Sequence, residues 1–282
     1  MLRTSHHSTG ATLGRAALIV AHPGHELNLM GWLAMSQPSV FVMTDGSGQL
    51  GRSRLHSTTK TLLRSGARPG SMYGHLSDQE VYEAMLDQDV DLFLRLTVEL
   101  ADCLCLDDVD YVVGDSAEGY NPTHDFCRTI IGGAVELATR LRGPIGNYEY
   151  VIAGPRLDCV MGRCRGAIKL TLDDQALERK IAAARGYPEL TGEVQSAVAR
   201  HGLESFRHEC LHPVDNRKSW TPDRSSQPPY EIHGQSRVAA GKYRRAVSYA
   251  DHIAPLEAAL REALPQSLEA PVGTSMAGAG MG

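Results

Sequence analysis

Short apolar runs alternate with longer amphipathic stretches through the first two thirds of the chain. The runs indicate strands buried on both faces, whereas the longer stretches carry the spacing of helices. The pattern predicts strands at Ala17–Ala21, Ser39–Thr44, Asp110–Gly114, Tyr148–Ala153 and Ala167–Leu172. It predicts helices at Glu26–Ser36, Ser53–Ser65, Gln79–Leu104 and Thr123–Leu141. Such alternation predicts an α/β fold with a mostly parallel sheet and helices on both faces.

The last third of the chain has a different character. Helical stretches are expected at Asp173–Arg185, Glu189–Arg200 and Ser236–Leu264, and the Pro- and Ser-rich segment between the last two is expected to be a loop. We therefore expect a disordered N-terminus over residues 1–15 and an α/β domain over residues 16–215. A C-terminal loop and helices over residues 216–264 would cap or pack on that domain, and residues 265–282 would form a disordered tail.

Composition narrows the class of protein. The 282 residues are 42% hydrophobic and 22% charged, which is typical of a soluble globular protein. The net charge of −5, without a long basic run, argues against a nucleic-acid partner. No stretch approaches the roughly 20 apolar residues that span a bilayer. The first fifteen residues lack the apolar core of a secretory signal, so a cytoplasmic location is expected.

Two histidines follow the first predicted strand, three residues apart. His22 and His25 would therefore lie at the carboxyl edge of the sheet, where open α/β sheets bind their ligands. His124 follows a later strand and would reach the same edge. Neutral imidazoles are good zinc ligands, and they also suit iron, cobalt and nickel. These three residues predict a metal site, with zinc as the expected ion and a hydrolase as the expected class of protein.

The motifs around these histidines resemble those of a known family. A strand ends in Ala-His-Pro-x-x-Glu, a second strand ends in Thr-x-Gly, and x-Pro-x-His opens a helix after a later strand. Over residues 17–214 this order is similar to that of the PIG-L/LmbE-like zinc-dependent de-N-acetylases, including a late helix with a lysine, here Lys180. The resemblance implies a Rossmann-like fold, a metal-binding catalytic domain over residues 16–215, and removal of an acyl group from an amino sugar or related N-acyl amine.

The chain departs from the family motifs at informative positions. The family has Ala-His-Pro-Asp-Asp-Glu, in which the first Asp is the general base and the second a zinc ligand; here Gly24 and His25 stand at those positions. In the family's His-x-Asp-His motif, Asn121 and Thr123 replace the first His and the Asp, and His124 keeps the ligand position. Three imidazoles leave a fourth position for water, and the loss of a charged ligand is expected to strengthen the Lewis acid.

Another residue must replace the missing base if the reaction is amide hydrolysis. The candidates are Asp45, Glu26, Asp115 and Asp125. Asp45 is favoured because it follows a neighbouring strand. Glu26 has the alternative role of holding a ligand or the helix N-terminus, and Asp125 that of orienting an imidazole from behind. Asn121 is a candidate hydrogen-bond donor to a developing oxyanion.

Two alternatives to the hydrolase remain open. The altered pair Gly24 and His25 is consistent with a metalloenzyme of specialised metabolism that has another acyl donor or a non-hydrolytic reaction. A catalytically inactive homologue that binds metal or sugar is the third interpretation. Replacing Gly24 by Asp is expected to separate them through a gain in deacetylase activity. Asp78 is interpreted most simply as the N-cap of the long helix. The expected partner is a small N-acyl amine, and the oligomeric state stays open.

Overall fold

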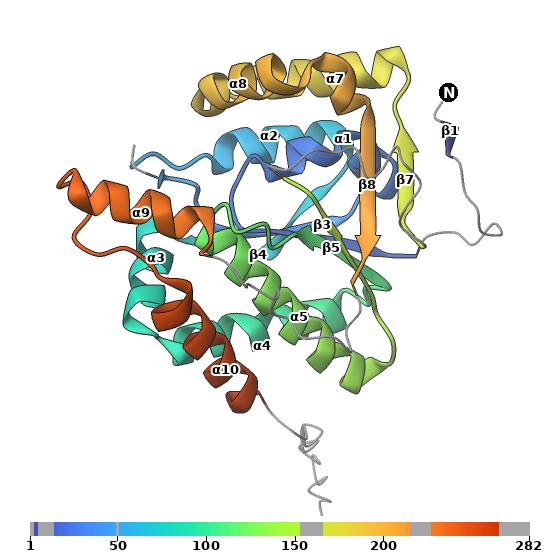
Figure 1. Cartoon of the computed structure of the whole chain (residues 1–282). Helices are drawn as coiled ribbons and strands as arrows, with labels where there is room; N and C mark the ends of the chain where they lie inside the picture. Colours follow the sequence, from blue (N-terminus) through green and yellow to red (C-terminus); the bar gives the residue numbers. More distant parts are fainter. Residues whose placement is uncertain (1–2, 5–13, 49–50, 153–165, 215–226, 265–282) are drawn as a thin grey trace, which may run out of the picture.

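The computed structural model describes residues 3–4, 14–48, 51–152, 166–214 and 227–264. They form a central sheet with the strand order β1-β7-β8-β6-β5-β2-β3-β4 (Figure 1). The strands are β1 (Arg3–Thr4), β2 (Ala16–Val20), β3 (Ser39–Thr44), β4 (Arg68–Leu76), β5 (Tyr111–Asp115), β6 (Gly146–Tyr150), β7 (Ile168–Thr171) and β8 (His208–Pro213).

The sheet is parallel on one side and antiparallel on the other. Strands β4, β3, β2, β5 and β6 run parallel to their neighbours. Strands β8, β7 and β1 extend the sheet with antiparallel pairings. The chain leaves β2 toward β3 and β4, and later returns to β5 on the other side of β2, so the order reverses between β2 and β5. Such a switch point opens a crevice at the carboxyl ends of the strands.

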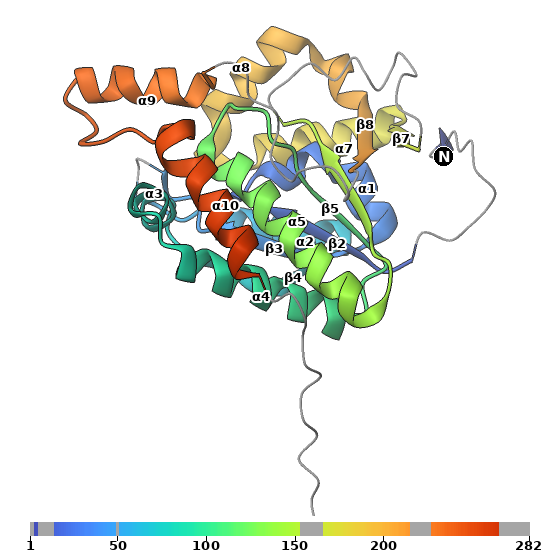
Figure 2. The ribbon, with the colours of Figure 1, turned by 60° about the horizontal axis from the view of Figure 1, so that its bottom comes forward.

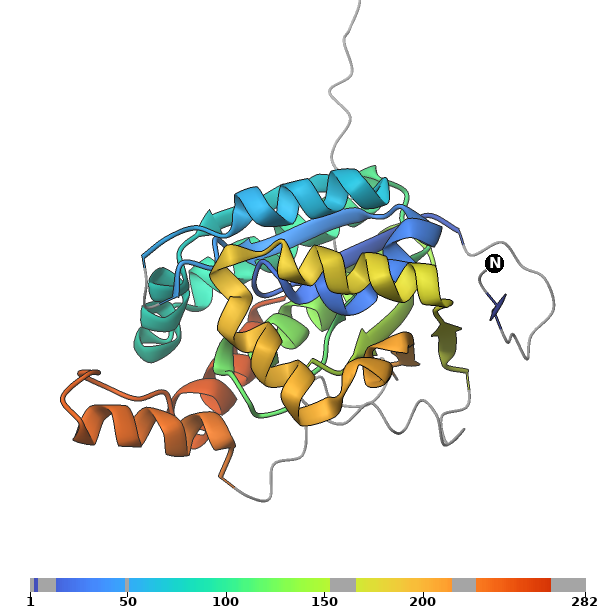
Figure 3. The ribbon, with the colours of Figure 1, turned by 90° about the horizontal axis from the view of Figure 1, so that it is seen from above.

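Helices cover both faces of this sheet. Figure 1 places α1, α2, α7 and α8 on one face and α4, α5 and α10 on the other; Figure 3 shows α2 and α7 from above. The helices are α1 (Met30–Ser36), α2 (Leu55–Ser65), α3 (Asp78–Asp87), α4 (Val90–Leu106), α5 (Pro122–Arg142), α7 (Asp174–Arg185), α8 (Thr191–His201), α9 (Pro229–Ala239) and α10 (Ala254–Ala263). The expected α/β class, with a mostly parallel sheet and helices around it, is confirmed.

Two hydrophobic layers hold the helices to the sheet. Alternate residues of a strand point to opposite faces, so in β2 Ile19 packs with Phe93 and Phe126 from α4 and α5. Leu18 packs on the opposite face with Trp32 from α1. Because both faces are buried, every residue of β2 is apolar, and that continuous run made the strand visible in the sequence.

The long helix expected at Gln79–Leu104 is two helices, α3 and α4. Gln88 ends α3 in the left-handed region at φ 53°, and the carboxylate of Asp89 accepts a hydrogen bond from Leu92 N at 2.9 Å to cap α4. The apolar spacing continues across this break because both helices face the same core, so periodicity alone joined them.

The helical stretch expected at Ser236–Leu264, with a possible break at Pro255, is interrupted earlier in the chain. Helix α9 ends at Ala239, and a π-helical turn, η5 (Tyr249–Ile253), leads into α10. Pro255 lies in the first turn of α10, directly after η5, at a helix-start position that proline favours. Helix α10 packs against α4 and α5 (Figure 2), and Leu256 and Leu260 are buried in the core on that face.

Three strands were not expected from the sequence. The two-residue β1 pairs with β7, within the N-terminal segment that was expected to be disordered. The edge strand β4 contains Pro69 and Gly70, which disfavour a regular ladder, and its pairing with β3 shifts register. Strand β8 places the carboxylate of Glu209 at a buried position, which breaks the apolar alternation. The predictions for residues 1–15, 216–226 and 265–282 fall outside the described residues, apart from 3–4 and 14–15. No helix in the described ranges is long and apolar enough to cross a membrane.

Candidate active site

The three histidines selected from the sequence lie together at the switch point. His22 follows β2, His25 begins the short 3-10 helix η1 (His25–Leu29), and His124 lies in the first turn of α5. The ring centroids are 5.4 Å apart for His22 and His25, 5.0 Å for His22 and His124, and 4.4 Å for His25 and His124. The cluster forms because β2 and β5 are hydrogen-bonded neighbours whose carboxyl ends meet at one edge.

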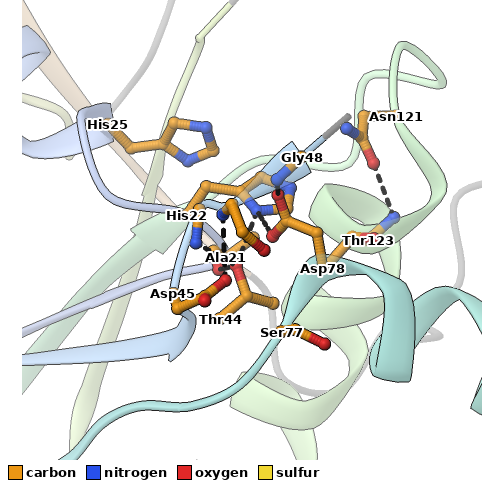
Figure 4. Close-up of polar contacts among 12 residues, drawn as sticks. Ala21, His22, His25, Thr44, Asp45, Gly48, Ser77, Asp78, Asn121 and Thr123 are labelled. Atoms are coloured by element: carbon orange, nitrogen blue, oxygen red, sulfur yellow. Dashed lines mark hydrogen bonds and ion pairs between the residues drawn. The ribbon is translucent and has the colours of Figure 1, made fainter. Parts of the chain in front are cut away.

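His22 is held through Nδ1. This atom lies 2.8 Å from Thr44 Oγ1 and 2.9 Å from Asp78 Oδ1 (Figure 4). The Thr44 hydroxyl itself donates to the carbonyl of Ala21 at 3.0 Å, so the proton of the imidazole belongs on Nδ1. His22 Nε2 is buried and has no hydrogen-bond partner within the described residues. That nitrogen therefore presents a lone pair to the cluster.

Asp78 is not the N-cap expected from the sequence. Ser77 caps α3 in a capping box with Glu80, and Asp78 turns toward His22 instead. Its second oxygen accepts a hydrogen bond from Gly48 N at 2.6 Å. Burial raises the pKa of Asp78, but the hydrogen bond and the charge attraction to His22 outweigh it, and the pKa lies well below its usual range. The Ser-x-x-Glu spacing was the signal in the sequence that freed Asp78 from the capping role.

His25 is held by a different carboxylate. Its Nδ1 lies 2.7 Å from Asp115 Oδ2. Asp115, at the end of β5, also accepts hydrogen bonds from Ala21 N at 2.8 Å and from the Tyr150 hydroxyl at 2.9 Å. Burial alone lowers the pKa of His25, but the charge of Asp115 and the hydrogen bond to it outweigh that effect and raise the pKa above its usual value.

His124 completes the cluster as a neutral ring. Burial lowers its pKa well below the usual value, and the proximity of His25 and His22 lowers it further. A neutral imidazole at neutral pH is the form that binds a metal. The exposed ring of Tyr120 lies 6.3 Å from the ring of His124, centroid to centroid, on the loop that leads from β5 into α5.

A metal ion suits these residues in chemistry more than in the present side-chain geometry. No group of three or more His, Cys, Asp or Glu side chains in the described ranges is arranged as a metal site. However, three imidazoles bound to one tetrahedral zinc ion would have ring centres about 5 Å apart, given Zn–N distances of about 2.0–2.1 Å. The observed ring separations are of that size. Nε2 of His22, which has no hydrogen-bond partner within the described residues, is a buried nitrogen with a lone pair that a metal ion could accept.

Gly24 leaves no room for the carboxylate that the family motif has there. Its φ of 106° lies in the left-handed region, which residues other than glycine rarely adopt. A Cβ atom at this position would lie 2.4 Å from Cδ1 of Leu190. Leu190 belongs to the 3-10 segment η3 (Pro188–Leu190) between α7 and α8. An aliphatic side chain therefore fills the space beside the histidines.

Three of the five candidate catalytic residues already accept two or more hydrogen bonds: Asp115, as described above, and Glu26 and Asp125. The buried carboxylate of Glu26 accepts hydrogen bonds from Gly24 N at 2.7 Å and from the Tyr187 hydroxyl, and burial raises its pKa. The buried carboxylate of Asp125 accepts from Gly119 N at 3.0 and 3.2 Å. Glu26 therefore holds the turn that opens η1, and Asp125 holds the loop before α5. The considered role of Asp125 in orienting an imidazole stays a prediction.

The other two candidates, Asp45 and Asn121, each use one side-chain oxygen in a hydrogen bond within the described part of the chain. Asp45 is half-buried after β3, and one oxygen accepts from Ser47 N at 2.9 Å. Asn121 is the N-cap of α5, where its Oδ1 accepts from Thr123 N at 2.8 Å (Figure 4). The cap uses the oxygen of Asn121 and leaves its NH2 group as the potential donor.

Comparison with known proteins adds only distant likenesses. No family model matches the chain, and no curated protein matches it. Among solved structures, the A40926 pseudoaglycone deacetylase Dbv21 is similar with 18% identity over 74% of this chain and 100% of its own, at a TM-score of 0.49. A zinc-inhibited form of the teicoplanin deacetylase Orf2 is similar with 13% identity over 71% and 97%, at 0.43. Scores this low carry no inference, so the fold stands on the strand order above.

Proposed function

We propose that this protein is a metal-dependent hydrolase of a C–N amide bond that removes an acyl group from an amino sugar or a related small N-acyl amine. The supporting observation is the histidine cluster itself. Three imidazoles meet at the switch point of the sheet, and carboxylates hold Nδ1 of His22 and His25. Nε2 of His22 is buried without a partner in the described residues. The substrate class comes from the motif resemblance.

His22, His25 and His124 would hold the ion. Zinc, or another divalent transition metal, supplies a Lewis acid that polarises an acyl oxygen and lowers the pKa of water. Asp78 and Asp115 keep the proton of each imidazole on Nδ1, so that Nε2 is the donor atom. The NH2 group of Asn121 would donate to the acyl oxygen as negative charge develops on it.

Asp45 is the proposed proton acceptor. Its carboxylate is half-buried and follows the strand next to β2. Among the described residues, only the oxygen bonded to Ser47 N has a side-chain hydrogen bond. Glu26 and Asp125 then have positioning roles, since each already accepts hydrogen bonds from a loop of the site. Asp45→Asn is expected to lower kcat with little effect on metal content, because the side chain is not proposed as a ligand.

Metal analysis joined to an activity panel tests this function. The purified protein, supplied with zinc, is expected to hold one ion per chain and to hydrolyse members of a panel of N-acetyl and N-acyl amino sugars. His22→Ala is expected to lose both properties. His201→Ala, at the exposed end of α8, is the matched control and is expected to keep both. Full activity of a thoroughly metal-free preparation contradicts the proposal.

A metalloenzyme with a different reaction is the second candidate. The observation that favours it is the side chain of Leu190, which fills the space where the family motif places its general base. A chain that binds the ion yet is inert toward the whole panel would favour this candidate or a binding homologue. Turnover of an N-acyl substrate favours the hydrolase.

A further inference from the structure

Asp115 is the most enclosed acidic group beside the histidine cluster. Its side chain is 0% exposed, and all its described partners are hydrogen-bond donors: His25 Nδ1, Ala21 N and the Tyr150 hydroxyl. These donors come from three segments, the end of β2, the turn after it and β6. A carboxylate so fully enclosed and so closely bonded keeps a fixed place behind the His25 ring.

The charge of Asp115 bears on the identity of residue 25. An aspartate at position 25, as in the family motif, would bring one negative charge directly to the ion. His25 brings none, but the carboxylate 2.7 Å behind it brings one negative charge through the imidazole. The pair His25 and Asp115 therefore has the same net charge as a single aspartate ligand. In a buried site of low effective dielectric, this charge is only weakly screened.

We propose that Asp115 is a positioning residue that restores, through His25, the negative charge missing from the three-histidine ligand set. This inference rests on the proposed metal-dependent function. It revises the expectation that the ion is a stronger Lewis acid than in the family motif. The negative charge of the family's aspartate ligand is still present, on Asp115 behind His25 rather than directly on a ligand. The acceptor also fixes the tautomer of His25 and raises its basicity toward the ion.

The inference predicts that a negative charge at position 25 can substitute for the negative charge at position 115. Asp115→Asn leaves no negative charge in the pair, and His25→Asp leaves two carboxylates facing each other. The double variant H25D/D115N again holds one carboxylate and one neutral partner, because the new amide at position 115 would donate its NH2 group to the new carboxylate at position 25. Metal affinity is expected to fall about 10- to 100-fold in D115N. It is expected to fall in H25D as well, and to recover at least about tenfold from H25D to the double variant, a recovery of about 1.4 kcal/mol.

The experiment measures zinc affinity of the full chain by competition with a chelator. Asp87→Asn, which makes the same chemical change at an exposed ion pair with Arg245, is the matched control and is expected to bind zinc as the wild type does. Nitrogen chemical shifts of His25 supply a second readout, because a neutral amide oxygen is expected to hold the Nδ1–H proton less strongly than the carboxylate of Asp115 and so to move both ring-nitrogen shifts. Unchanged affinity in D115N, or no recovery in the double variant, overturns the inference.

The outcomes separate the inference from the proposed function. A wild type that binds zinc and a D115N variant that binds equally well overturn the inference alone. A wild type that binds no divalent metal overturns both. Should D115N fail to fold, His25→Asp against His25→Asn decides by thermal unfolding without metal. H25D is expected to unfold at the lower temperature because its carboxylate faces Asp115, and equal unfolding temperatures contradict the inference.

Discussion

The two histidines of the first turn are held alike but in different surroundings. Each binds a carboxylate through Nδ1, at 2.9 Å for His22 and Asp78 and at 2.7 Å for His25 and Asp115. The side chain of Asp78 is 18% exposed, and its second oxygen bonds to the exposed Gly48 loop. The side chain of Asp115 is fully buried, and Tyr150 holds its second oxygen.

This difference separates hydrogen-bond geometry from hydrogen-bond strength. Two contacts of similar length are expected to differ in energy, because water screens the partly exposed pair of His22 and Asp78 but not the buried carboxylate of Asp115 beside His25. We therefore expect Asp115, behind His25, to set the charge of the site. Asp78, behind His22, mainly orients the imidazole ring and ties the loop after β3 to α3.

The largest effect is expected from His124→Ala, which removes the ring that lies 5.0 Å from His22 and 4.4 Å from His25, centroid to centroid. The variant is expected to lose stoichiometric zinc and all detectable hydrolysis, since two imidazoles rarely hold zinc tightly in a protein. Metal analysis and the activity panel check this, with His201→Ala as the control. Retention of a full equivalent of zinc would show that the ion binds elsewhere.

A second buried ion pair, away from the histidines, tests whether burial determines the strength of these contacts. Lys180 donates to Glu209 at 2.8 Å, with side chains 3% and 0% exposed, and Glu209 also caps α1 through Gly31 N and Trp32 N. Lys180→Met leaves that carboxylate charged and without its cation. We expect a loss of about 3–5 kcal/mol in the free energy of unfolding.

Chemical denaturation measures the effect of Lys180→Met. The control is Arg245→Met at the exposed pair with Asp87, which is expected to cost at most about 1 kcal/mol. Equal losses at the buried and exposed pairs would refute the claim that burial decides the strength of these contacts. The comparison between Asp115 and Asp78 would then lose its physical basis.

Gly24→Asp tests whether the turn that carries both histidines accepts the family's carboxylate. The left-handed backbone is expected to cost about 1–3 kcal/mol, and Leu190 must move away from the new side chain. Deacetylase activity is therefore not expected from the single variant. In the Leu190→Ala background, Gly24→Asp is expected to cost less stability.

A double-mutant cycle measured by denaturation gives the coupling between positions 24 and 190. A favourable coupling of at least about 0.5 kcal/mol is expected for residues in contact. Additive losses would show that Leu190 does not block the position. A gain in amide hydrolysis in G24D/L190A alone would identify the missing base as the limiting group.

The smallest effect is expected at Asp78, the partly exposed carboxylate behind His22. Asp78→Asn keeps a hydrogen-bond acceptor beside His22 and loses a charge that solvent already screens. Zinc affinity is expected to fall only a few-fold, less than the roughly 10- to 100-fold expected for Asp115→Asn. The same chelator competition checks it. A larger loss in D78N than in D115N would reverse the comparison.

Much of the fold was visible in the sequence because it depends on local patterns. The predicted strand Ser39–Thr44 contains a continuous apolar run over residues 40–43, and the observed strand has the same bounds. The helix that follows Asn121 begins with Pro122 at its first position, a start signal that needs no tertiary information. Elements that broke these rules were missed, as β4 was with its proline and glycines.

The sequence by itself determined the alternation of strands and helices and the placement of three histidines after two of the strands. These features follow from residue spacing and from the rule that parallel strands end at one edge. Only the tertiary structure decided which carboxylates stand behind the histidines and what fills the space at Gly24. Asp78, Asp115 and Leu190 are far from the first histidine turn in the chain, and their roles arise from packing between distant segments, which no local pattern encodes.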